Sequence, residues 1–494
     1  MKKRTGPSAI EGRIQAPPSK SYAQRAIAVA AMAEGRSVIL SPGDSDDVVA
    51  AVNVVRQLGA RVEKWPLKSA PPGEADTAEG SADERGRAEE RGTENEKVTG
   101  LERDDEVTKD HSVAGSSRGA EEGSSDAGGG QGTGTGRSAS ATGKAVEQGL
   151  VVFGGLQRPD GMLDCGEAGL SVRMFSAVAS LFDSPVTLTG RGSLLKRPMV
   201  VIEESLRALG VECTTVNGCL PVTVRGPLPG GKAVIDGSFS SQVLTGILIA
   251  SPYAASDVTL LVKNLKSRPY IDMTLKVMEL FGVEVENRGY SEFLVRHGQR
   301  YQPREYRVEG DWSGAAFLLV AGATGGSVTV ENLDTSSPQA DRAIVDALER
   351  AGANVATGTG EVTVSRGNLE AFMFDATDCP DLFPPLVTLA AFCEGTTTIR
   401  GAERLLHKES NRAATLSREF GKLGVEVKVT GDIMKIKGGG CNGGTVESHG
   451  DHRIAMACAT AAIAAHGEVL IEGAEAVAKS YPRFFEDMES LRKG

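Results

Sequence analysis

Cysteine and histidine are scarce in this chain of 494 residues, and neither is arranged as a structural staple. The seven cysteines are odd in number and include no CxxC pair, which is typical of reduced thiols in the cytosol. HExxH is absent, and no other spaced set of histidine and cysteine ligands occurs, so we expect no metal site. Because there are only six histidines, proton transfer would fall to Lys, Asp and Glu.

Long apolar runs are also missing, since none approaches the roughly 18 to 20 residues of a membrane helix. Lys2, Lys3 and Arg4 are not followed by the apolar stretch of a secretory signal. The net charge of -11 argues against a nucleic-acid binder, and neither a Walker loop nor a GxSxG elbow is present. We therefore expect a cytoplasmic α/β protein of two or more domains that acts on small molecules.

Residues 68–148 differ from the rest of the chain in composition. Lys68 to Glu147 contain 18 acidic and 10 basic residues and no aromatic one, and Gly, Ser, Glu and Thr are frequent. Such a segment buries too little apolar surface to order itself, so it is predicted to be a disordered insertion. Strand-like residues flank it on both sides, at 61–65 and 150–153. The insertion therefore replaces a hairpin turn in this interpretation, with a partner-binding tail as the alternative.

A repeated pattern organises the remainder of the chain. A short strand of small, β-branched and aliphatic residues recurs about every 70 residues once the insertion is subtracted. Its six copies are Ser37 to Leu40, Pro185 to Leu188, Val258 to Leu261, Ser327 to Val330, Thr396 to Ile399 and Glu468 to Ile471. A helix that ends in glycine and runs into a strand recurs five times, at Gly59, Gly210, Gly282, Gly352 and Gly424.

The sixth helix–glycine–strand junction is missing, because the chain ends in a helix at 481–492. The segment Ala9 to Gln15 is predicted to supply the missing strand. Six α/β units of about 70 residues group as three plus three, which gives two similar domains with a substrate cleft between them. An open solenoid of six units is the alternative.

Basic and hydroxyl side chains gather in loops before several predicted helices. Lys20 and Arg25 accompany a helix start that Ser19 or Ser21 could cap, and such a start suits an anion. Gly166 and Gly169 precede a helix that runs to Leu181. Further clusters lie at Lys196-Arg197, Ser240-Ser241-Gln242, Lys408 with Arg412, Asp451-His452-Arg453 and Lys479. A cleft between two domains would bring these cations around more than one anionic group.

Two carboxylates stand beside these cations. Asp381 is isolated before an apolar stretch, so it is interpreted either as a helix cap or as a base with a raised pKa. Glu409 lies between Lys408 and Arg412, which would share one face of a helix if this segment were helical.

At these residues the chain resembles the EPSP synthases, the 3-phosphoshikimate 1-carboxyvinyltransferases. The resemblance covers the whole chain outside the insertion. It rests on Pro18-Ser19-Lys20-Ser21 with Arg25, Ser240-Ser241-Gln242, Ser267-Arg268-Pro269-Tyr270-Ile271-Asp272, Lys408-Glu409-Ser410-Asn411-Arg412, Asp451-His452-Arg453 and Ala478-Lys479. It implies a two-domain inside-out α/β barrel of six βαβαββ-type repeats, three in each domain. Residues 19–301 would form the first domain, which binds shikimate 3-phosphate, and residues 1–18 and 302–494 the second.

The resemblance also implies a reaction without metal or organic cofactor, carried out by a monomer. The enolpyruvyl group of phosphoenolpyruvate would pass to the 5-hydroxyl of shikimate 3-phosphate, and phosphate would be released. Asp381 would take the hydroxyl proton, Glu409 would protonate the methylene carbon, and Lys20 would assist at the breaking bond. Shikimate 3-phosphate would contact Lys20, Ser21, Arg25, Ser240, Ser241, Gln242, Ser267, Asp381 and Lys408. Phosphoenolpyruvate would contact Lys20, Gly169, Arg197, Gln242, Arg412, Arg453 and Lys479.

Three residues depart from the commonest bacterial pattern of this family. Glu167 and Leu170 stand in the glycine loop where that pattern has Asn and Thr. Glu167 would repel phosphoenolpyruvate or, if it pairs with a cation, tune its affinity. Arg404 stands where many members have Asn, and its contact with the substrate phosphate is an expectation.

Two other functions are alternatives to this one: a different enolpyruvyl transfer and noncatalytic anion binding. The sister enolpyruvyl transferase, which acts on UDP-N-acetylglucosamine, usually has a cysteine before the Arg-Pro pair, and residues 192–196 contain none. A noncatalytic anion-binding scaffold would not need Lys20, Asp381 and Glu409 together.

Overall fold

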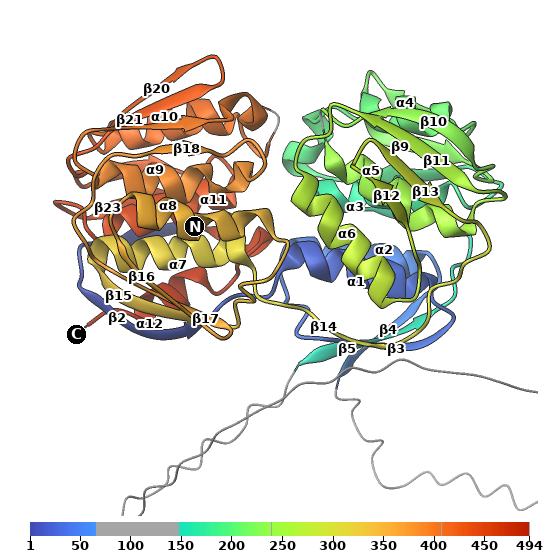
Figure 1. Cartoon of the computed structure of the whole chain (residues 1–494), viewed down its shortest axis with the longest axis horizontal. Helices are drawn as coiled ribbons and strands as arrows, with labels where there is room; N and C mark the ends of the chain where they lie inside the picture. Colours follow the sequence, from blue (N-terminus) through green and yellow to red (C-terminus); the bar gives the residue numbers. More distant parts are fainter. Residues whose placement is uncertain (66–147, 239, 407, 494) are drawn as a thin grey trace, which may run out of the picture. The chain divides into compact units, whose positions relative to one another are not determined.

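The protein is described by a computed structural model that covers residues 1–65, 148–238, 240–406 and 408–493. In these residues the fold is mixed α/β, with five four-stranded sheets and one three-stranded sheet (Figure 1). None of the described helices combines the length and the apolar character needed to cross a membrane. The expected disorder of the insertion concerns residues that lie outside those described.

The first three sheets come from residues between 35 and 307. In spatial order their strands are β14 (Glu305–Arg307), β3 (Gly35–Leu40), β5 (Gly149–Gly154) and β4 (Arg61–Trp65); β6 (Leu163–Asp164), β7 (Val186–Thr189), β9 (Cys219–Arg225) and β8 (Glu212–Val216); and β10 (Gly231–Asp236), β11 (Val258–Lys263), β13 (Glu292–Val295) and β12 (Glu286–Arg288).

The other three sheets combine the N-terminus with residues after 325. Their strands are β16 (Asn354–Gly358), β17 (Glu361–Ser365), β15 (Gly326–Glu331) and β2 (Ile10–Gln15); β18 (Met373–Asp375), β19 (Thr396–Arg400), β21 (Ile433–Lys437) and β20 (Glu426–Thr430); and β1 (Lys2–Thr5), β23 (Val469–Glu472) and β22 (Gly444–Glu447).

All six sheets share one pairing pattern around one strand each. These strands are β3, β7, β11, β15, β19 and β23, and they coincide within two residues with the six predicted copies. Each pairs in parallel with one neighbour and antiparallel with the other. The glycines of the five predicted junctions all have positive φ, which confirms that they end their helices in the left-handed conformation.

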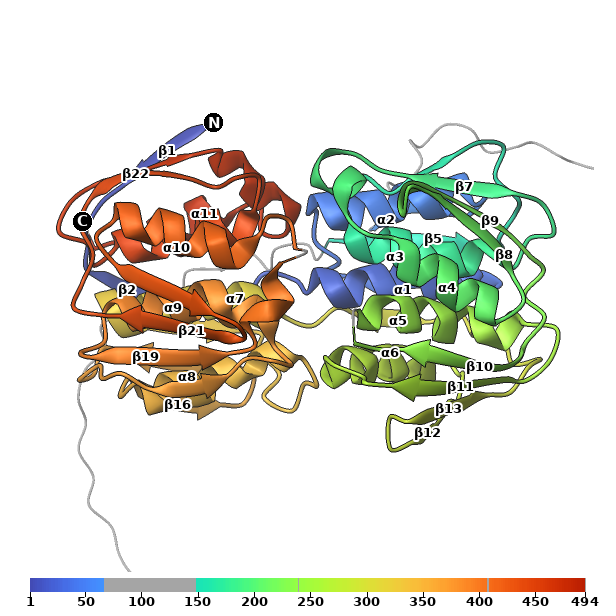
Figure 2. The same ribbon diagram turned by 90° about the horizontal axis from the view of Figure 1, so that it is seen from above.

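The helices, whose arrangement Figure 2 shows, divide by the burial of their residues into a buried and a half-buried group. The half-buried ones are α2 (Asp46–Gln57), α4 (Val200–Ala208), α6 (Arg268–Leu280), α8 (Ile344–Arg350), α10 (Arg412–Lys422) and α12 (Phe484–Ser490). The ones buried nearly all round are α1 (Lys20–Met32), α3 (Gly169–Ala179), α5 (Ser241–Ala250), α7 (Trp312–Gly325), α9 (Phe383–Ala391) and α11 (His452–Ala462). Small and apolar residues cover every face of the second group, so burial on all sides stabilises them.

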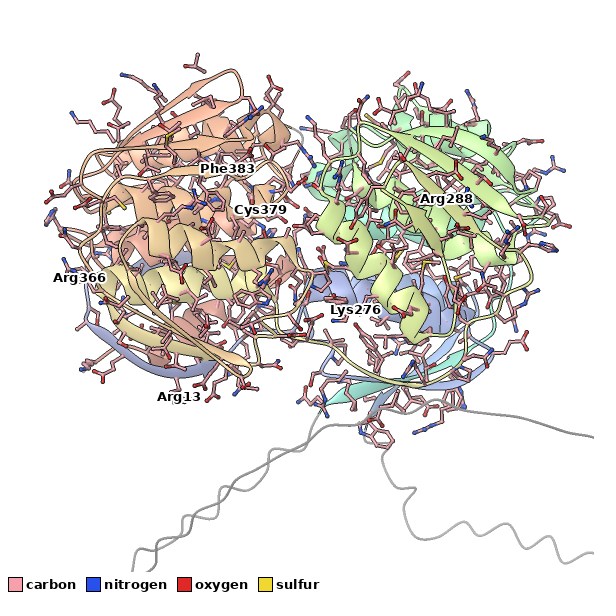
Figure 3. The ribbon with its side chains drawn as sticks, in the orientation of Figure 1. Arg13, Lys276, Arg288, Arg366, Cys379 and Phe383 are labelled. Carbon is pink, nitrogen blue, oxygen red and sulfur yellow. The ribbon has the colours of Figure 1, made fainter. Side chains whose placement is uncertain are left out.

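Buried apolar residues form two separate clusters, whereas an open solenoid would have one continuous core. One cluster takes its members from residues 22–308, and the other from Ile10, Ala16 and residues 312–491. Phe383 and Cys379 lie inside the second cluster, while Arg13 and Arg366 lie at its outer surface (Figure 3). Strand β14 belongs to the sheet of β3, so residues 305–307, predicted to start the second domain, pack with the first cluster.

Two chain segments join the clusters and are hydrogen bonded to each other. The Ser19 amide donates to the Glu309 carbonyl at 2.9 Å, and the Asp311 amide donates to the Pro17 carbonyl at 2.7 Å. This pairing places the start of α1 next to the start of α7, at the junction of the two clusters.

The N-terminal strand prediction is wrong in its pairing. Strand β2, which corresponds to Ala9–Gln15, pairs in parallel with β15. Lys2–Thr5, which we had not predicted as a strand, forms β1 and supplies the antiparallel partner of β23. The last sheet is therefore completed by residues nearer the N-terminus than expected.

The strands that flank the insertion form a hairpin ladder, as predicted. Strands β4 and β5 pair antiparallel, from Arg61 opposite Phe153 to Trp65 opposite Gly149. The ends of this ladder fix where residues 66–148 leave and rejoin the sheet.

Candidate active site

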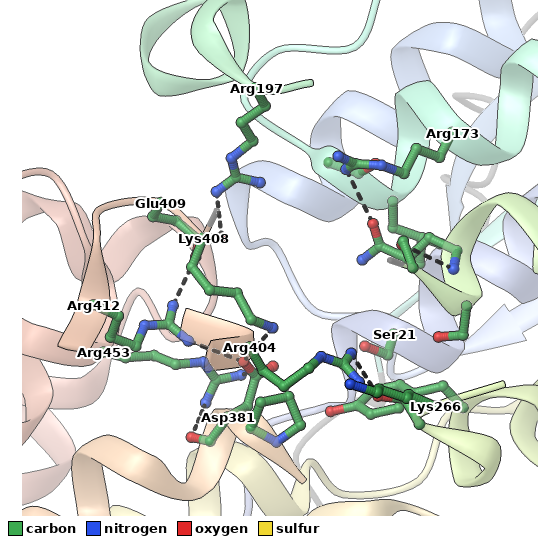
Figure 4. Close-up of a pocket in the computed structure, with 18 of the residues that line it drawn as sticks. Ser21, Arg173, Arg197, Lys266, Asp381, Arg404, Lys408, Glu409, Arg412 and Arg453 are labelled. Atoms are coloured by element: carbon green, nitrogen blue, oxygen red, sulfur yellow. Dashed lines mark hydrogen bonds and ion pairs between the residues drawn. The ribbon is translucent and has the colours of Figure 1, made fainter. Parts of the chain in front are cut away.

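A cavity of about 510 Å³ lies where the two clusters meet (Figure 4). It is lined by the first residues of five helices, α1, α3, α5, α10 and α11, and by the residue before α6. Helix N-termini present free amides and a positive dipole end, so their convergence favours negatively charged ligands.

The structure brings nearly all predicted site residues to this cavity. Those that line it are Lys20, Ser21, Arg25, Gly169, Arg197, Ser240, Ser241, Gln242, Ser267, Asp381, Lys408, Glu409, Arg412 and Arg453. Lys479 does not line the cavity, but its Nζ lies 3.8 Å from Oε1 of Glu409, which does. Within the described residues, no group of three or more His, Cys, Asp and Glu side chains could hold a metal ion.

The start of α1 contributes two cations in different surroundings. Nζ of Lys20 lies 2.7 Å from Oδ2 of Asp47, and both side chains are nearly buried. Arg25 is fully buried and donates to the Thr274 hydroxyl at 2.9 Å and to the Ser21 carbonyl at 2.8 Å. Because Arg25 is buried and no carboxylate pairs with it among the described residues, its pKa is lowered to about 10. Ser19 stands at the N-cap of α1, but its hydroxyl makes no capping hydrogen bond.

The glycine at the start of α3 leaves room for two guanidinium groups. A Cβ on Gly169 would lie 2.8 Å from Nη1 of Arg197 and 3.0 Å from Nη1 of Arg173. Arg173 also donates to the Gly169 carbonyl at 3.1 Å and to Oε1 of Gln242 at 3.2 Å. Burial, together with the charge of Arg197, lowers the pKa of Arg173 to about 9. A side chain larger than hydrogen at position 169 would displace these cations from the cavity wall.

Hydroxyl and amide groups line the side formed by α5 and α6. Ser240 caps α5 by accepting from the Gln242 amide at 3.2 Å. The Ser267 amide donates to Oδ1 of Asp378 at 2.7 Å, and its hydroxyl accepts from Arg404 at 3.0 Å. Because Asp378 and Arg404 belong to the other cluster's part of the chain, this pair of contacts joins the two sides of the cavity.

Asp381 is surrounded by cations on both carboxylate oxygens. Its Oδ1 lies 3.2 Å from Lys408 Nζ and 3.0 Å from Arg412 Nη1, and its Oδ2 accepts from Arg453 at 3.1 Å. Burial alone would raise the pKa of Asp381, but Arg453, Lys408 and Arg412 hold it well below its usual range. Our expectation of a capping residue or a base with a raised pKa is therefore wrong. Asp381 follows the N-cap of a short 3₁₀ helix, Pro380–Leu382, and is an anion held by three partners.

Glu409 faces a second group of cations. Its Oε1 lies 3.0 Å from Arg197 Nη2, and its Oε2 accepts from Arg412 at 2.6 Å. Against the effect of burial, Arg197, Arg412 and Lys479 hold the pKa of Glu409 well below its usual range. Lys408 precedes α10, which begins at Arg412, so it does not share a helix face with Arg412 as the spacing had suggested.

Arg412 joins three carboxylates and is itself fully buried. It donates to Asp451 from Nε at 2.9 Å and from Nη2 at 3.2 Å, in addition to its contacts with Asp381 and Glu409. The Asp451 side chain also caps α11 by accepting from the Arg453 amide at 3.0 Å. Asp451 thus orients two cavity arginines at once.

The cavity carries an excess of positive charge. Nine Lys and Arg side chains and four carboxylates line it, which leaves five uncompensated positive charges. Arg25, Arg173, Lys266 and Arg404 have no carboxylate within ion-pair distance among the described residues, whereas the other five do. The first four cations can therefore bind an anionic ligand directly, whereas the other five are already paired with carboxylates of the chain.

Arg173, Lys266, Tyr270, Asp47 and Asp451 line or support the cavity but were absent from the predicted site. Arg173 lies one turn into an apolar helix, where the pattern alone reads as core. Arg173 follows Gly169 by four residues, which places it beside that glycine on one face of the helix. This spacing was the signal that could have identified Arg173 as a cavity residue.

Glu167, which differs from the commonest bacterial pattern, is paired with a cation. Its Oε2 lies 3.7 Å from Nζ of Lys479, and the carboxylate packs against the backbone of Gly192, where a Cβ would require the Glu167 side chain to move. The alternative in which Glu167 pairs with a nearby cation is the one the structure supports.

The sequence of this chain is similar to those of known proteins over nearly its whole length. A family model described as EPSP synthase (3-phosphoshikimate 1-carboxyvinyltransferase) matches residues 4–79 and 145–488. A 3-phosphoshikimate 1-carboxyvinyltransferase of Clostridium novyi (strain NT) is 33% identical over 487 residues, which cover 98% of this chain and 96% of that protein. The one from Aeropyrum pernix is 35% identical over 486 residues, covering 98% and 94%.

Solved structures show a similar fold. An EPSP synthase from Acinetobacter baumannii has a TM-score of 0.71 at 24% identity, covering 99% of this chain and 98% of that one. The enolpyruvyl transferase NikO from Streptomyces tendae has a TM-score of 0.67 at 16% identity, covering 99% and 96%. At these identities the likeness bears on the fold alone.

Proposed function

The chain belongs to the EPSP synthase family and is thus an enolpyruvyl transferase of the shikimate pathway, and we propose that the cavity described above is its active site. Phosphoenolpyruvate and shikimate 3-phosphate bind there side by side. The enolpyruvyl group passes to the 5-hydroxyl of shikimate 3-phosphate, and phosphate is released. The observation that carries this proposal is the convergence of five helix N-termini and five surplus positive charges on one cavity.

The charges of the two substrates match that surplus. Each substrate carries a carboxylate and a phosphate of about -2, so together they bring about six negative charges. We assign shikimate 3-phosphate to Lys20, Ser21, Arg25, Ser240, Ser241, Gln242, Ser267, Asp381 and Lys408. We assign phosphoenolpyruvate to Lys20, Gly169, Arg197, Gln242, Arg412, Arg453 and Lys479. The carboxylate-free cation Arg404 donates to Ser267 and extends the first set's side of the cavity. Arg173 donates to Gln242, which belongs to both sets, and to the Gly169 carbonyl of the second set.

The proton transfers fall to Asp381, Glu409 and Lys20 in this proposal. Asp381 accepts the 5-hydroxyl proton, Glu409 protonates the methylene carbon of phosphoenolpyruvate, and Lys20 assists at the bond to the leaving phosphate. In the structure Glu409 is held ionised by Arg197, Arg412 and Lys479. A bound trianion neutralises these cations and thereby raises the pKa of Glu409, which prepares it to act as an acid.

The finer architecture is part of the same proposal. The shared pairing pattern of six sheets supports a two-domain inside-out barrel of six repeats, and the two apolar clusters support a domain boundary after Val308. One chain supplies both sides of the cavity, which supports a monomer as the active unit. All seven cysteines are free, which supports action in the reducing cytoplasm.

The test is phosphate release from the purified protein. Release should require phosphoenolpyruvate and shikimate 3-phosphate together, and UDP-N-acetylglucosamine should not replace the latter. Glu409→Gln keeps the shape of the side chain but cannot transfer the proton, so kcat should fall by about 10²- to 10⁴-fold with little change in KM. Release that needs no shikimate 3-phosphate, or a variant with normal kcat, would contradict the proposal.

A further inference from the structure

Asp341 is a buried carboxylate behind the cavity that the proposed reaction does not yet use. It lies in the short 3₁₀ helix Ala340–Ala343 and is 4% exposed. Its Oδ2 accepts a hydrogen bond from the Tyr270 hydroxyl at 3.2 Å, and its Oδ1 has no hydrogen-bond partner among the residues that the structure describes. A buried carboxylate oxygen without a partner is costly, so it calls for an explanation.

Asp341 lines a small cavity together with Asp381. This second cavity has a volume of about 10 Å³, which is room for about one water molecule. Its lining includes Ser21 and Tyr270 from the first cluster's side and Asp311, Ser313 and Arg453 from the other. The chain itself thus provides a polar connection between the two carboxylates.

The charged neighbours of Asp341 come from four elements. Asp381 precedes α9, Arg453 lies on α11, Asp311 caps α7, and the phenol of Tyr270 lies on α6. Burial, Asp381 and Asp311 raise the pKa of Asp341 to about 7, although Arg453 opposes them. Burial, together with the charges of Asp341 and Asp381, also raises the pKa of Tyr270 well above its usual value, so its hydroxyl keeps its proton and donates to Asp341.

The two carboxylates differ sharply as bases. Three cations stabilise the ionised form of Asp381, so a proton placed on it is held weakly. No cation lies within ion-pair distance of Asp341 in the described residues, so a proton placed there is held more firmly. A proton that reaches Asp381 therefore has a downhill path to Asp341.

We propose that Asp341 is a positioning residue for the proton of this reaction: it relieves Asp381 of the substrate proton through one water in the shared cavity. This inference rests on the proposed role of Asp381 as the base. As the 5-oxygen of shikimate 3-phosphate bonds to C2 of phosphoenolpyruvate, its O–H bond breaks and the electron pair stays on oxygen. The proton moves to Asp381, which protonates the water while the water gives a proton to Oδ1 of Asp341. The proton returns by the same path and leaves with the phosphate, so atoms and charge balance without a redox step.

The first experiment is the pH profile of kcat for the wild-type enzyme and for Asp341→Asn. Asp341 accepts a proton only when it is ionised, so wild-type kcat should fall as the pH drops through about 7. The variant should lose that limb and be slower by about tenfold or more at pH 8, with KM for both substrates within about twofold. Asp346→Asn is the matched control, because Asp346 lies exposed on α8 and pairs with Arg350 at the surface. It should follow the wild-type profile.

A second measurement keeps the inference testable if Asp341→Asn does not fold. Infrared difference spectra of the wild-type protein between pH 6 and pH 8 should show a protonated carboxyl band that disappears with a midpoint near 7. Aspartate labelled with ¹³C should shift this band, which assigns it to an Asp.

The outcomes separate this inference from the proposed function. Phosphate release with a flat wild-type profile, or a variant whose KM for shikimate 3-phosphate rises while kcat and its pH limb persist, would overturn the role of Asp341 and leave the function standing. A wild-type protein that releases no phosphate would overturn both.

Discussion

Arg412 is the residue on which most of the site's charge depends. It is buried and contacts Asp381, Glu409 and Asp451, so its removal leaves three carboxylates without their shared cation. Lys20 offers a comparison, because it pairs with one carboxylate, Asp47. The loss of a partner from a buried ion pair costs far more than the pair contributes, since the remaining charge stays desolvated.

We expect Arg412→Ala to lower the free energy of unfolding by about 3–5 kcal/mol, and Lys20→Ala, which leaves one carboxylate unpaired instead of three, by about 1–3 kcal/mol. Both variants should raise KM for phosphoenolpyruvate. Thermal unfolding and steady-state kinetics measure the two effects separately, and Arg412→Lys tests the affinity if the alanine variant does not fold. Unchanged KM in both Lys20→Ala and Arg412→Lys would remove these residues from the binding site.

Glu167 gives a prediction of opposite sign. Its carboxylate lies 3.7 Å from Lys479 Nζ, and that ammonium has no hydrogen-bond partner within the described part of the chain. Because Glu167 competes with an anionic ligand for Lys479, Glu167→Gln should lower KM for phosphoenolpyruvate two- to fivefold, on the order of 0.5–1 kcal/mol in binding. KM for shikimate 3-phosphate should not change, and Glu212→Gln, on exposed β8, should change neither. A rise in KM for phosphoenolpyruvate would instead mean that Glu167 holds Lys479 in place.

The sequence predicted most of the cavity's cations but not their electrostatic state. The signal was position: a cluster of cations at or just before a helix start suits an anion, and this is where the chain has Lys20, Arg197, Lys408 and Arg453. The pKa direction of Asp381 was wrong because its partners lie 27, 31 and 72 residues away in the chain. Only the folded chain brings these groups together.

At the scale of elements, α10 holds the loop before α11 at two points. Arg412 at its start binds Asp451, and Glu419, two turns later on the same face, binds the other end of the loop. Glu419 is fully buried and accepts from the Glu447 amide at 2.8 Å and from Lys422 at 2.6 Å, and its Oε1 lies 2.9 Å from Nε2 of His449. His449 has a φ of +52°, so the loop depends on such contacts to keep its shape.

Glu419→Gln should therefore loosen the loop that orients Asp451. We expect a loss of about 1–3 kcal/mol in unfolding free energy and a higher KM for phosphoenolpyruvate, while Glu426→Gln on exposed β20 changes neither. Burial raises the pKa of Glu419, but hydrogen bonds from Lys422, His449 and the Glu447 amide hold it below its usual range. The stabilisation is thus complete above the unfolded-state pKa and is lost as the pH falls through the folded-state value.

Melting temperatures of Glu419→Gln and the wild type should consequently converge in acid, and a difference that persists unchanged at low pH would contradict this explanation.

The elements themselves were predictable where local pattern decides them. Glycine at a helix end and β-branched residues in a strand act over a few residues, so the six central strands and five junctions were placed within two residues. Strand pairing is not local, because the partners of β1 and β2 lie more than 300 residues away. The sequence of β1, Lys-Lys-Arg-Thr, also has a single β-branched residue and no aromatic one, so it lacks the composition typical of a strand. The N-terminal pairing was wrong for these reasons.

At the scale of the whole molecule, polar contacts at the site itself join the two clusters. Arg197 to Glu409, Ser267 to Asp378 and Arg404, and Glu167 to Lys479 all cross the cavity. The hydrogen-bonded crossings at Ser19–Glu309 and Pro17–Asp311 bring the chain through the same region. The fold therefore places its ligand-binding groups where neither cluster is complete without the other.

The insertion joins the fold at the end of the β4–β5 ladder, and neither of these strands lines the cavity. Strands β4 and β5 form a continuous ladder that ends at Trp65 opposite Gly149, so a tight turn can connect them directly. We expect that replacing residues 66–148 with Asn-Gly, a sequence that favours a two-residue hairpin turn, leaves kcat and both KM values unchanged.

Stability should rise in this variant rather than fall. Shortening a loop of some 80 residues to two removes roughly five doublings of loop length, which lowers the closure cost by about 3 kcal/mol. Calorimetry measures this gain, and a variant with a scrambled insertion of equal length separates the effect of length from that of sequence. A lower melting temperature would show that residues 66–148 pack on the fold. A lower kcat at unchanged stability would show that they act on the site, and in that event the scrambled variant should be as slow as the deletion.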